Sequence, residues 1–298
     1  MTTNPLTDGA FNRTLRLADG RIVSYADVGA QDGMPVLLFL GMHGHRHATV
    51  LVEAVARQRG LRLLCIDRPG YGLSSPLPYD AATPEPIAFT DIVQALVDAL
   101  DIARFGVMGQ SAGALYAMAV ASQSHLAPRI VAPLVLISPW VRLTNSRTSR
   151  VLYAASYAPR SVLAAAVKVM DISMEWGAVW SASDEMALLG TNMSIPFGEL
   201  RARVATEAHN AYGDILLCLE KDPRGVGYDV LTDLRVPLHV VHGATDGMVP
   251  VDAAVSFVAS IQGATITIVP ETPHRFIDFY KTGIELAFDA FAPSTTSV

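Results

Sequence analysis

The chain has 298 residues, of which 51% are hydrophobic and 17% are charged; this balance excludes an intrinsically disordered protein and favours a large buried core. The formal net charge is −6 and the sequence contains no basic run, so we expect no nucleic-acid partner. The length suits one large domain, with room for an inserted subdomain.

No segment has the pattern of a membrane anchor or a secretory signal. The most apolar stretches, such as residues 130–141, are shorter than the about 20 residues that a membrane-spanning helix needs. Residues 1–14 lack a charged region followed by an apolar one. Without a secretory signal, Cys65 and Cys218 are interpreted as reduced core thiols. We therefore expect a cytoplasmic protein without a membrane span, either monomeric or homodimeric.

The first half of the chain alternates predicted strands with predicted helices. The first dozen residues are expected to form a loose tail, and Asp19-Gly20 between two alternating runs predicts a hairpin. Continuously apolar runs then predict strands buried on both faces. The strands are expected at residues 35–40, 61–66, 104–108 and 130–137, and the helices at residues 47–59, 87–100 and 112–121. This alternation predicts an α/β fold with a mostly parallel sheet of about eight strands flanked by helices.

The alternation stops between residues 140 and 228. This stretch has no convincing strand and is rich in Ala, Met and Trp at helical spacing. We interpret residues 140–228 as a helical cap inserted into a core formed by residues 1–139 and 229–298. Two further apolar runs, residues 237–242 and 264–269, predict the last strands, and residues 293–298 are expected to form a second loose tail.

The sequence Gly109-Gln110-Ser111-Ala112-Gly113 lies where a predicted strand becomes a predicted helix. A very tight strand-to-helix turn strains the backbone of its central serine, and the residues two before and two after it must be small. Both are glycine here. On its own this pattern also fits an ordinary glycine-rich turn. Interpretation of the pattern as a nucleophile elbow requires that an acid and a histidine follow it in the right order.

Both partners follow in the second half of the chain. Asp246 comes after the strand predicted at residues 237–242, and His274 comes after the strand at residues 264–269. Asp67 is a competing acid, but it precedes Pro69-Gly70 and is better interpreted as a turn residue. Glu271 is a second alternative, because it is close to His274 in the sequence.

These motifs resemble those of the α/β-hydrolase family, in which the order is also serine, acid, histidine. The resemblance extends to residues 67–75 (DRPGYGLSS), 242–250 (HGATDGMVP) and 273–277 (PHRFI), and it covers nearly the whole chain. It implies an α/β-hydrolase fold in which the helical cap lies over Ser111. It also implies that Ser111 is the nucleophile, His274 its base and Asp246 the group that orients the histidine.

The resemblance further implies two backbone N–H groups that bind an oxyanion. One belongs to Ala112, the residue after the nucleophile. The second is assigned to Met42, by aligning Gly41 with the glycine of the family's His-Gly motif; Leu40 then replaces the family's histidine. An alternative alignment uses His43-Gly44 and assigns the donor to His45, but it leaves Gly41 unexplained and the preceding strand unusually long.

Several other residues are candidates for binding the substrate, and one cluster for binding a metal. The substrate-binding candidates are Gly41, His43, Gln110, Trp140 and Met248. His43, His45 and His47 alternate, but at a strand-to-helix junction we expect them to diverge, and no carboxylate or cysteine cluster completes a metal site. We therefore expect no metal and no organic cofactor. Asp214 and Glu220 of the cap are expected to be solvated.

The leading functional hypothesis is a serine hydrolase that cleaves a carboxylic ester or lactone of an apolar small molecule through an acyl-enzyme on Ser111. A C–C bond hydrolase, an aminopeptidase of the proline-iminopeptidase type and a perhydrolase are alternatives that use the same triad. Epoxide hydrolases and haloalkane dehalogenases are disfavoured, because they have aspartate where Ser111 stands. A non-hydrolytic biosynthetic catalyst or a ligand-binding protein of this fold stays open, because Leu40 departs from the family pattern.

Overall fold

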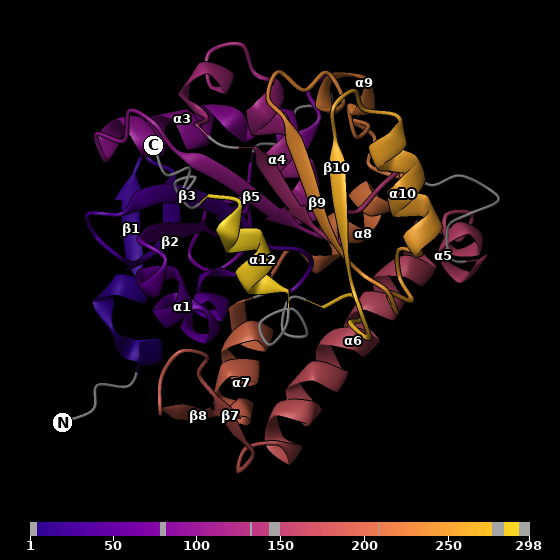
Figure 1. Cartoon of the computed structure of the whole chain (residues 1–298). Helices are drawn as coiled ribbons and strands as arrows, with labels where there is room; N and C mark the ends of the chain where they lie inside the picture. Colours follow the sequence, from indigo (N-terminus) through magenta and orange to yellow (C-terminus); the bar gives the residue numbers. More distant parts are fainter. Residues whose placement is uncertain are drawn as a thin grey trace.

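An eight-stranded sheet runs through the centre of the computed structural model (Figure 1). The structure describes residues 5–77, 82–131, 133–142, 150–207, 209–275 and 283–291. Strand β2 is antiparallel to its neighbours β1 and β4, and the other neighbouring pairs are parallel, which confirms the predicted α/β sheet. The strand order is β1 (Arg13–Arg16), β2 (Ile22–Gly29), β4 (Leu61–Ile66), β3 (Met34–Phe39), β5 (Gly106–Gln110), β6 (Leu134–Ile137), β9 (Leu238–Gly243) and β10 (Thr265–Val269).

The central strands are apolar along their whole length because both faces of the sheet are covered. In β3, Leu37 belongs to the core cluster on one face, while Val36 and Leu38 belong to the cluster on the other. The first face is covered by α3 (Thr90–Ala99), α4 (Gly113–Ser122) and α10 (Val251–Ala259), and the second by α1 (Glu53–Gln58) and α12 (Ile284–Asp289). Every side chain of α4 is buried, as expected for a helix that is apolar all round.

The segment between β6 and β9 is mainly helical. It contains α5 (Arg150–Ala155), α6 (Arg160–Trp180), α7 (Phe197–Glu207), α8 (Ala211–Cys218) and α9 (Tyr228–Leu231). Figure 1 shows α6 running along the lower right edge of the molecule, and α6 packs against α7 and α8. The expectation that this segment has no strand was wrong, because β7 (Glu185–Ala187) and β8 (Ser194–Pro196) form an antiparallel pair. Strands of three residues are too short to give an alternating pattern.

The beginning of the chain also differs from the prediction. Within the described residues, residues 5–11 contain two 3₁₀ turns, η1 (Pro5–Thr7) and η2 (Gly9–Phe11), and this part of the expected loose tail is ordered. Leu6 and Phe11 are buried in the core cluster that includes α1 and α12. Two isolated apolar residues give no periodicity, which is why the sequence did not reveal this packing. The predicted hairpin is confirmed as β1 and β2, and the predicted tail at residues 293–298 lies outside the described residues.

Several predicted elements are shorter or divided. The helix predicted at residues 47–59 is a 3₁₀ helix, η3 (Arg46–Leu51), followed by α1, and the helix predicted at residues 87–100 is divided into α2 (Glu85–Ala88) and α3. Strand β6 begins only at Leu134. A further 3₁₀ helix, η4 (Ala127–Arg129), precedes it.

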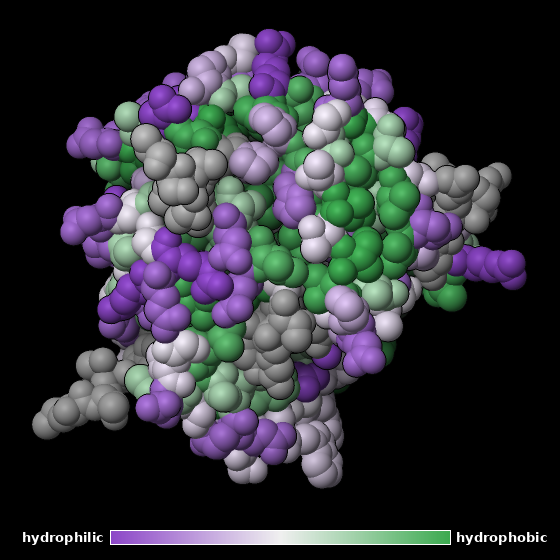
Figure 2. All heavy atoms as spheres, in the orientation of Figure 1, coloured by the Kyte–Doolittle hydropathy of each residue, from purple (hydrophilic) through white to green (hydrophobic). Residues whose placement is uncertain are grey.

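The molecular surface offers two further observations. On the face seen in Figure 2, apolar side chains gather over β10 and α10, where Ile268 and Val255 are exposed. Within the described part of the chain, no helix combines the length and the apolar character needed to cross a bilayer.

Candidate active site

Ser111 occupies the sharp turn between β5 and α4. Its φ angle of 51° lies in the left-handed region, which is strained for a residue with a side chain. A Cβ atom on Gly109 would lie 2.6 Å from the Cβ of Ala117, and one on Gly113 would lie 2.2 Å from the carbonyl oxygen of Phe39. The turn therefore requires glycine at both positions, for the steric reason that predicted the elbow.

The fold brings Ser111, His274 and Asp246 into one line of hydrogen bonds. The Nε2 atom of His274 lies 2.7 Å from Ser111 Oγ, and its Nδ1 atom lies 2.8 Å from Asp246 Oδ2. The loop after β9 supplies Asp246 and the loop after β10 supplies His274. Because β5, β6, β9 and β10 are parallel neighbours, their C-terminal ends meet at one edge of the sheet.

The second oxygen of Asp246 is fixed by backbone groups. The amides of Met248 and Val249 both donate to Oδ1, at 2.9 and 2.8 Å. Burial alone would raise the pKa of Asp246, but the hydrogen bond and charge of His274 and the amide of Val249 bring the pKa below its ordinary value. Asp246 is thus held as a carboxylate that can accept the Nδ1–H of His274.

Neither competing acid lies against His274. Asp67 is fully buried and accepts hydrogen bonds from Ser24 Oγ and from the amide and guanidinium of Arg46. Glu271 is exposed, and the structure gives it no contact with His274 among the described residues. The geometry therefore favours Asp246 over both alternatives.

The loop after β3 packs directly against Ser111. A Cβ atom on Gly41 would lie 2.7 Å from Ser111 Cβ, so only glycine fits there. The amide of Gly44 donates to the Gly41 carbonyl at 2.9 Å and closes a turn in which His43 has a φ of 61°. This position of Gly41 favours the alignment that assigns the oxyanion donor to Met42. Within the described residues, the amides of Met42 and Ala112 donate to no protein acceptor.

A buried arginine, which the sequence did not reveal, orients the peptide between Gly41 and Met42. Arg68 Nη2 donates to the Gly41 carbonyl at 2.8 Å. In a trans peptide the carbonyl and the following N–H point in opposite directions, so fixing the carbonyl also fixes the direction of the Met42 N–H. Arg68 thus positions the predicted oxyanion donor.

Arg68 is itself held by the cap. Asp214 in α8 accepts from Arg68 Nη1 and Nη2 at 2.5 and 2.7 Å, and from the Tyr71 hydroxyl at 2.5 Å. The expectation that Asp214 is solvated was wrong: it is 1% exposed, as is Arg68. Burial opposes the charge on Arg68, but attraction to Asp214 raises its pKa well above the ordinary value. This pair links the cap to the loop beside Ser111.

Two residues predicted to bind substrate are occupied by protein contacts. Gln110 Oε1 accepts from the Gly41 amide at 3.1 Å, and Gln110 Nε2 donates to the His274 carbonyl at 3.2 Å. Trp140 is 4% exposed, and its indole N–H donates to the carbonyl of Cys218 in α8 at 2.9 Å. Gln110 therefore connects two loops of the site, and Trp140 connects the core to the cap.

The other two side chains in that prediction lie at the edge of the site. His43 is nearly buried, and its Nε2 atom lies 2.9 Å from Asp171 Oδ1 in α6. Met248 is half-buried, and its amide contacts Asp246. A role in substrate binding stays a prediction for both.

The histidine cluster is arranged differently from the prediction. His43 diverges, but the rings of His45 and His47 converge with centroids 5.2 Å apart, and Glu207 of α7 brings a carboxylate beside them. Burial lowers the pKa of His45 to about 4 and that of His47 to about 3, so both are neutral near pH 7. Glu207 is already paired with Arg46 Nη1 at 2.5 Å. The cluster therefore attaches α7 to the core.

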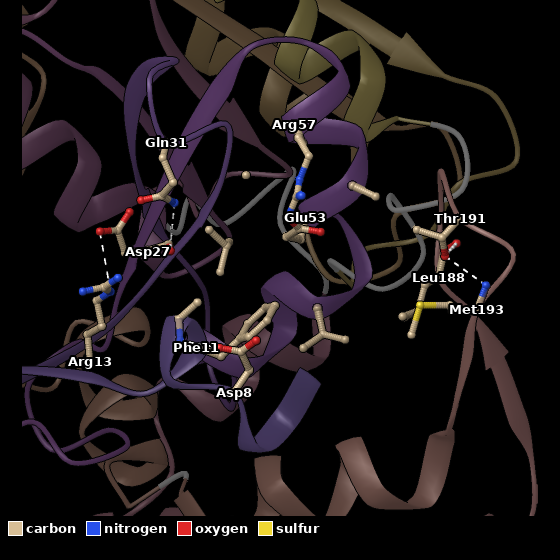
Figure 3. Close-up of a pocket in the computed structure, with 15 residues that line it drawn as sticks. Asp8, Phe11, Arg13, Asp27, Gln31, Glu53, Arg57, Leu188, Thr191 and Met193 are labelled. Atoms are coloured by element: carbon tan, nitrogen blue, oxygen red, sulfur yellow. Dashed lines mark hydrogen bonds and ion pairs between the residues drawn. The ribbon is translucent and has the colours of Figure 1, made fainter. Parts of the chain in front are cut away.

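Both cysteines are free and buried, as the sequence predicted. A surface cavity of about 570 Å³ lies away from Ser111, between the N-terminal segment, α1 and the segment around β7 and β8 (Figure 3). Four of its charged side chains are paired with one another: Arg13 lies 3.7 Å from Asp27, and Arg57 pairs with Glu53. The carboxylate of Asp8 accepts from the Ala10 amide at 2.8 Å. None of the predicted site residues lines this cavity.

Comparisons with known proteins agree with this fold. A family model described as alpha/beta hydrolase fold matches residues 34–280. The chain is also similar to the dihydrolipoyllysine-residue acetyltransferase component of an acetoin cleaving system from Pseudomonas putida, with 32% identity over 120 residues. This match covers 40% of the chain but only 30% of the length of that protein.

Solved structures of similar fold include a hydrolase from Pseudomonas aeruginosa PA01, with 22% identity and a TM-score of 0.68 over 96% of this chain and 100% of that one. An esterase from Exiguobacterium antarcticum has 15% identity and a TM-score of 0.67, over 94% of this chain and 99% of that one. At these identities the structures share the fold.

Proposed function

We propose that this chain, which belongs to the alpha/beta hydrolase fold family, is a serine hydrolase that cleaves a carboxylic ester or lactone of an apolar small molecule. One observation carries the proposal: the hydrogen bonds from Ser111 through His274 to Asp246 are continuous, and two amides without protein acceptors lie beside the serine. A nucleophile, a base, an orienting carboxylate and candidate oxyanion donors are the groups that acyl transfer needs.

In the proposed reaction, Ser111 Oγ attacks the acyl carbon while His274 Nε2 takes its proton. Asp246 accepts the Nδ1–H and stabilises the imidazolium. The carbonyl oxygen becomes an oxyanion that accepts from the amides of Met42 and Ala112. The tetrahedral intermediate collapses as His274 gives the proton to the departing alcohol oxygen, which leaves an acyl-enzyme. Water, deprotonated by His274, then releases the acid and restores Ser111.

The packing around Leu40 supports a catalytic protein over a pure binding protein. Leu40 is 2% exposed and lies in the core cluster that includes α1 and α12. The polar bracing of this loop comes from Gln110 and Arg68, which bind the amide and the carbonyl of Gly41. The replacement of the family's histidine by leucine therefore leaves the loop with other supports.

A panel of substrates tests the proposal. The wild type and Ser111→Ala should each be assayed with esters of short and medium acyl chains, lactones, β-diketones and prolyl amides. Both should also be assayed for peracid formation from acetate. We expect saturable turnover with the esters or lactones and none with the variant. Turnover of β-diketones or prolyl amides alone would instead assign the C–C bond hydrolase or aminopeptidase activity, and turnover that survives Ser111→Ala would refute the triad.

A further inference from the structure

Helix α6 is apolar on two faces, and within the described residues only one of them packs against other elements. Leu163, Val167 and Ala178 are buried on the inner face. The outer face carries large apolar side chains that are 51–80% exposed: Val162, Val169, Ile172, Trp176, Val179 and Trp180. A surface helix normally carries polar residues on its outer face, and a contiguous exposed patch of this kind marks an interaction site.

The spacing of the outer face matches a helical partner. Apolar residues recur at alternate steps of three and four along one seam: Val162, Ala165, Val169, Ile172, Trp176 and Val179. This is the heptad pattern of a helix that packs against a second helix. Adsorption to a lipid surface has no need of such a regular seam, and it favours a cationic polar face.

We propose that the partner is α6 of a second copy of this chain, packed antiparallel across a two-fold axis. With the axis between residues 170 and 171, the seam forms layers of Val162 with Val179, Ala165 with Trp176, and Val169 with Ile172. The smallest seam residue thus faces the largest one. A parallel pair would instead place Trp176 against Trp176 and Ala165 against Ala165, with a clash in one layer and a void in the other.

The charges beside the seam favour the same arrangement. Lys168 and Glu175 are exposed and flank the seam on the same side, seven residues apart. In the antiparallel pair, Lys168 of one copy and Glu175 of the other flank the same side of the seam, offset along the axis by two residues, or about 3 Å, twice by symmetry. A parallel pair would place Lys168 near Ser173 and leave both charges without a partner.

The available surface is sufficient for a stable dimer. Helix α6 has 21 residues and is about 31 Å long. Its six large exposed side chains offer on the order of 700 Å² per copy, since a tryptophan alone can bury about 150–250 Å². A stable interface needs about 800 Å² per partner, which this helix pair and its flanking residues can provide.

The proposed seam leaves the candidate site untouched. Asp171, whose carboxylate contacts His43, lies on the opposite side of α6 from Val162 and Trp180. Variants of the seam should therefore change the association of the chain without changing the groups around Ser111, so that this inference and the proposed function can fail separately.

The first experiment measures mass in solution by sedimentation equilibrium. We expect twice 31.8 kDa for the wild type and 31.8 kDa for Val169→Glu at the same concentration, with at least a 100-fold weaker dimer. Val255→Glu, a matched change at an exposed valine of α10, should remain dimeric. Circular dichroism and melting curves check that both variants are folded. A monomeric wild type, or a dimer lost only with Val255→Glu, would overturn the proposal.

A charge exchange tests the antiparallel register without touching an apolar side chain. Lys168→Glu places like charges on the same side of the seam and should weaken the dimer about 10-fold, whereas Lys168→Glu combined with Glu175→Lys should restore it. If the single and double variants associate equally well, the register is wrong. Flotation with anionic vesicles supplies the remaining control: a monomer that binds vesicles through α6 would assign the face to lipid and refute the dimer.

Discussion

The sheet and the cap are held in place by different kinds of interaction. The central strands of the sheet are buried on both faces by apolar side chains, which follow one another continuously along each strand. The cap also contributes apolar side chains, such as Leu200 and Leu217, to the two core clusters, but it adds buried polar pairs between residues far apart in the chain. These pairs are Arg68 with Asp214, Arg46 with Glu207, Arg224 with Glu85, and Trp140 with the Cys218 carbonyl.

The sheet therefore supplies the groups of the proposed reaction, whereas the cap helps to position one of the loops that carry them. The proposed nucleophile, base and orienting acid all come from loops at the edge of the sheet. The loop that carries Met42 depends on Arg68, and Arg68 depends on Asp214 of the cap. Substitution of the proposed reacting groups should therefore abolish the reaction. Substitutions at the boundary between core and cap should lower both the stabilisation of the transition state and the stability of the folded protein.

The largest effect is expected at Ser111 itself. Ser111→Ala removes the nucleophile and should lower kcat about 10⁶-fold, and His274→Ala should do nearly the same. The Ser111 hydroxyl contacts only His274 within the described residues, so the melting temperature should stay close to that of the wild type. Steady-state kinetics with the best ester and a thermal melt measure both; activity retained by either variant would contradict the triad.

A smaller loss is expected for Asp246→Asn. The amide cannot hold His274 in the required tautomer, but the base stays in place, so we expect kcat to fall about 10⁴-fold with weak residual turnover. Full activity in this variant would mean that Asp67 or Glu271 serves instead.

The boundary between core and cap is tested by a pair of variants. Asp214→Leu leaves Arg68 as an unpaired buried charge and should cost about 3–5 kcal/mol of stability. Combined with Arg68→Met, it removes both charges and should recover most of that stability. The double variant should still lose about 10²-fold in kcat with little change in KM, because the Gly41 carbonyl lacks its donor and the Met42 N–H is no longer fixed.

Urea unfolding and steady-state kinetics on the single and double variants separate the two effects. A double variant with wild-type kcat would show that Arg68 has a structural role alone. A double variant that is as unstable as Asp214→Leu would show that the loss of stability does not come from the unpaired charge of Arg68.

The smallest expected effect is a loss of folding stability at acidic pH. His45 and His47 are buried and neutral, with pKa values lowered by burial to about 4 and about 3, whereas an unfolded histidine has its ordinary value of 6.5. The unfolded state therefore binds more protons as the pH falls below 6.5, and stability should decrease down to about pH 4. We expect a loss on the order of 1–2 kcal/mol per histidine by pH 5. Urea unfolding at pH 7.5 and pH 5 measures it, and His47→Gln should show a smaller difference than the wild type.

The sequence predicted the groups of the candidate site better than the contacts that hold them. Ser111, Asp246 and His274 each follow an apolar strand, and the tight turn at Ser111 requires the two glycines that flank it. Asp214 gave no local signal, because its partner Arg68 is 146 residues away and an acidic residue in a helix is usually solvated. The spacing of apolar residues along the chain gives no information on long-range pairs of this kind.

The cap shows the same limit. The helical spacing within residues 140–228 predicts helices there, but it does not show which of the two apolar faces of α6 packs against α7 and α8. The convergence of His45 and His47 likewise depends on η3, whose tighter turn replaces the regular helix that the spacing predicted.

The central claim is an activated serine in a complete site, and labelling by a fluorophosphonate tests it most directly. Intact mass should show one adduct on the wild type, none on Ser111→Ala, and much slower labelling of His274→Ala, because the base must deprotonate the serine. An unlabelled wild type that is fully folded would contradict the account and would make ligand binding the leading function of this fold.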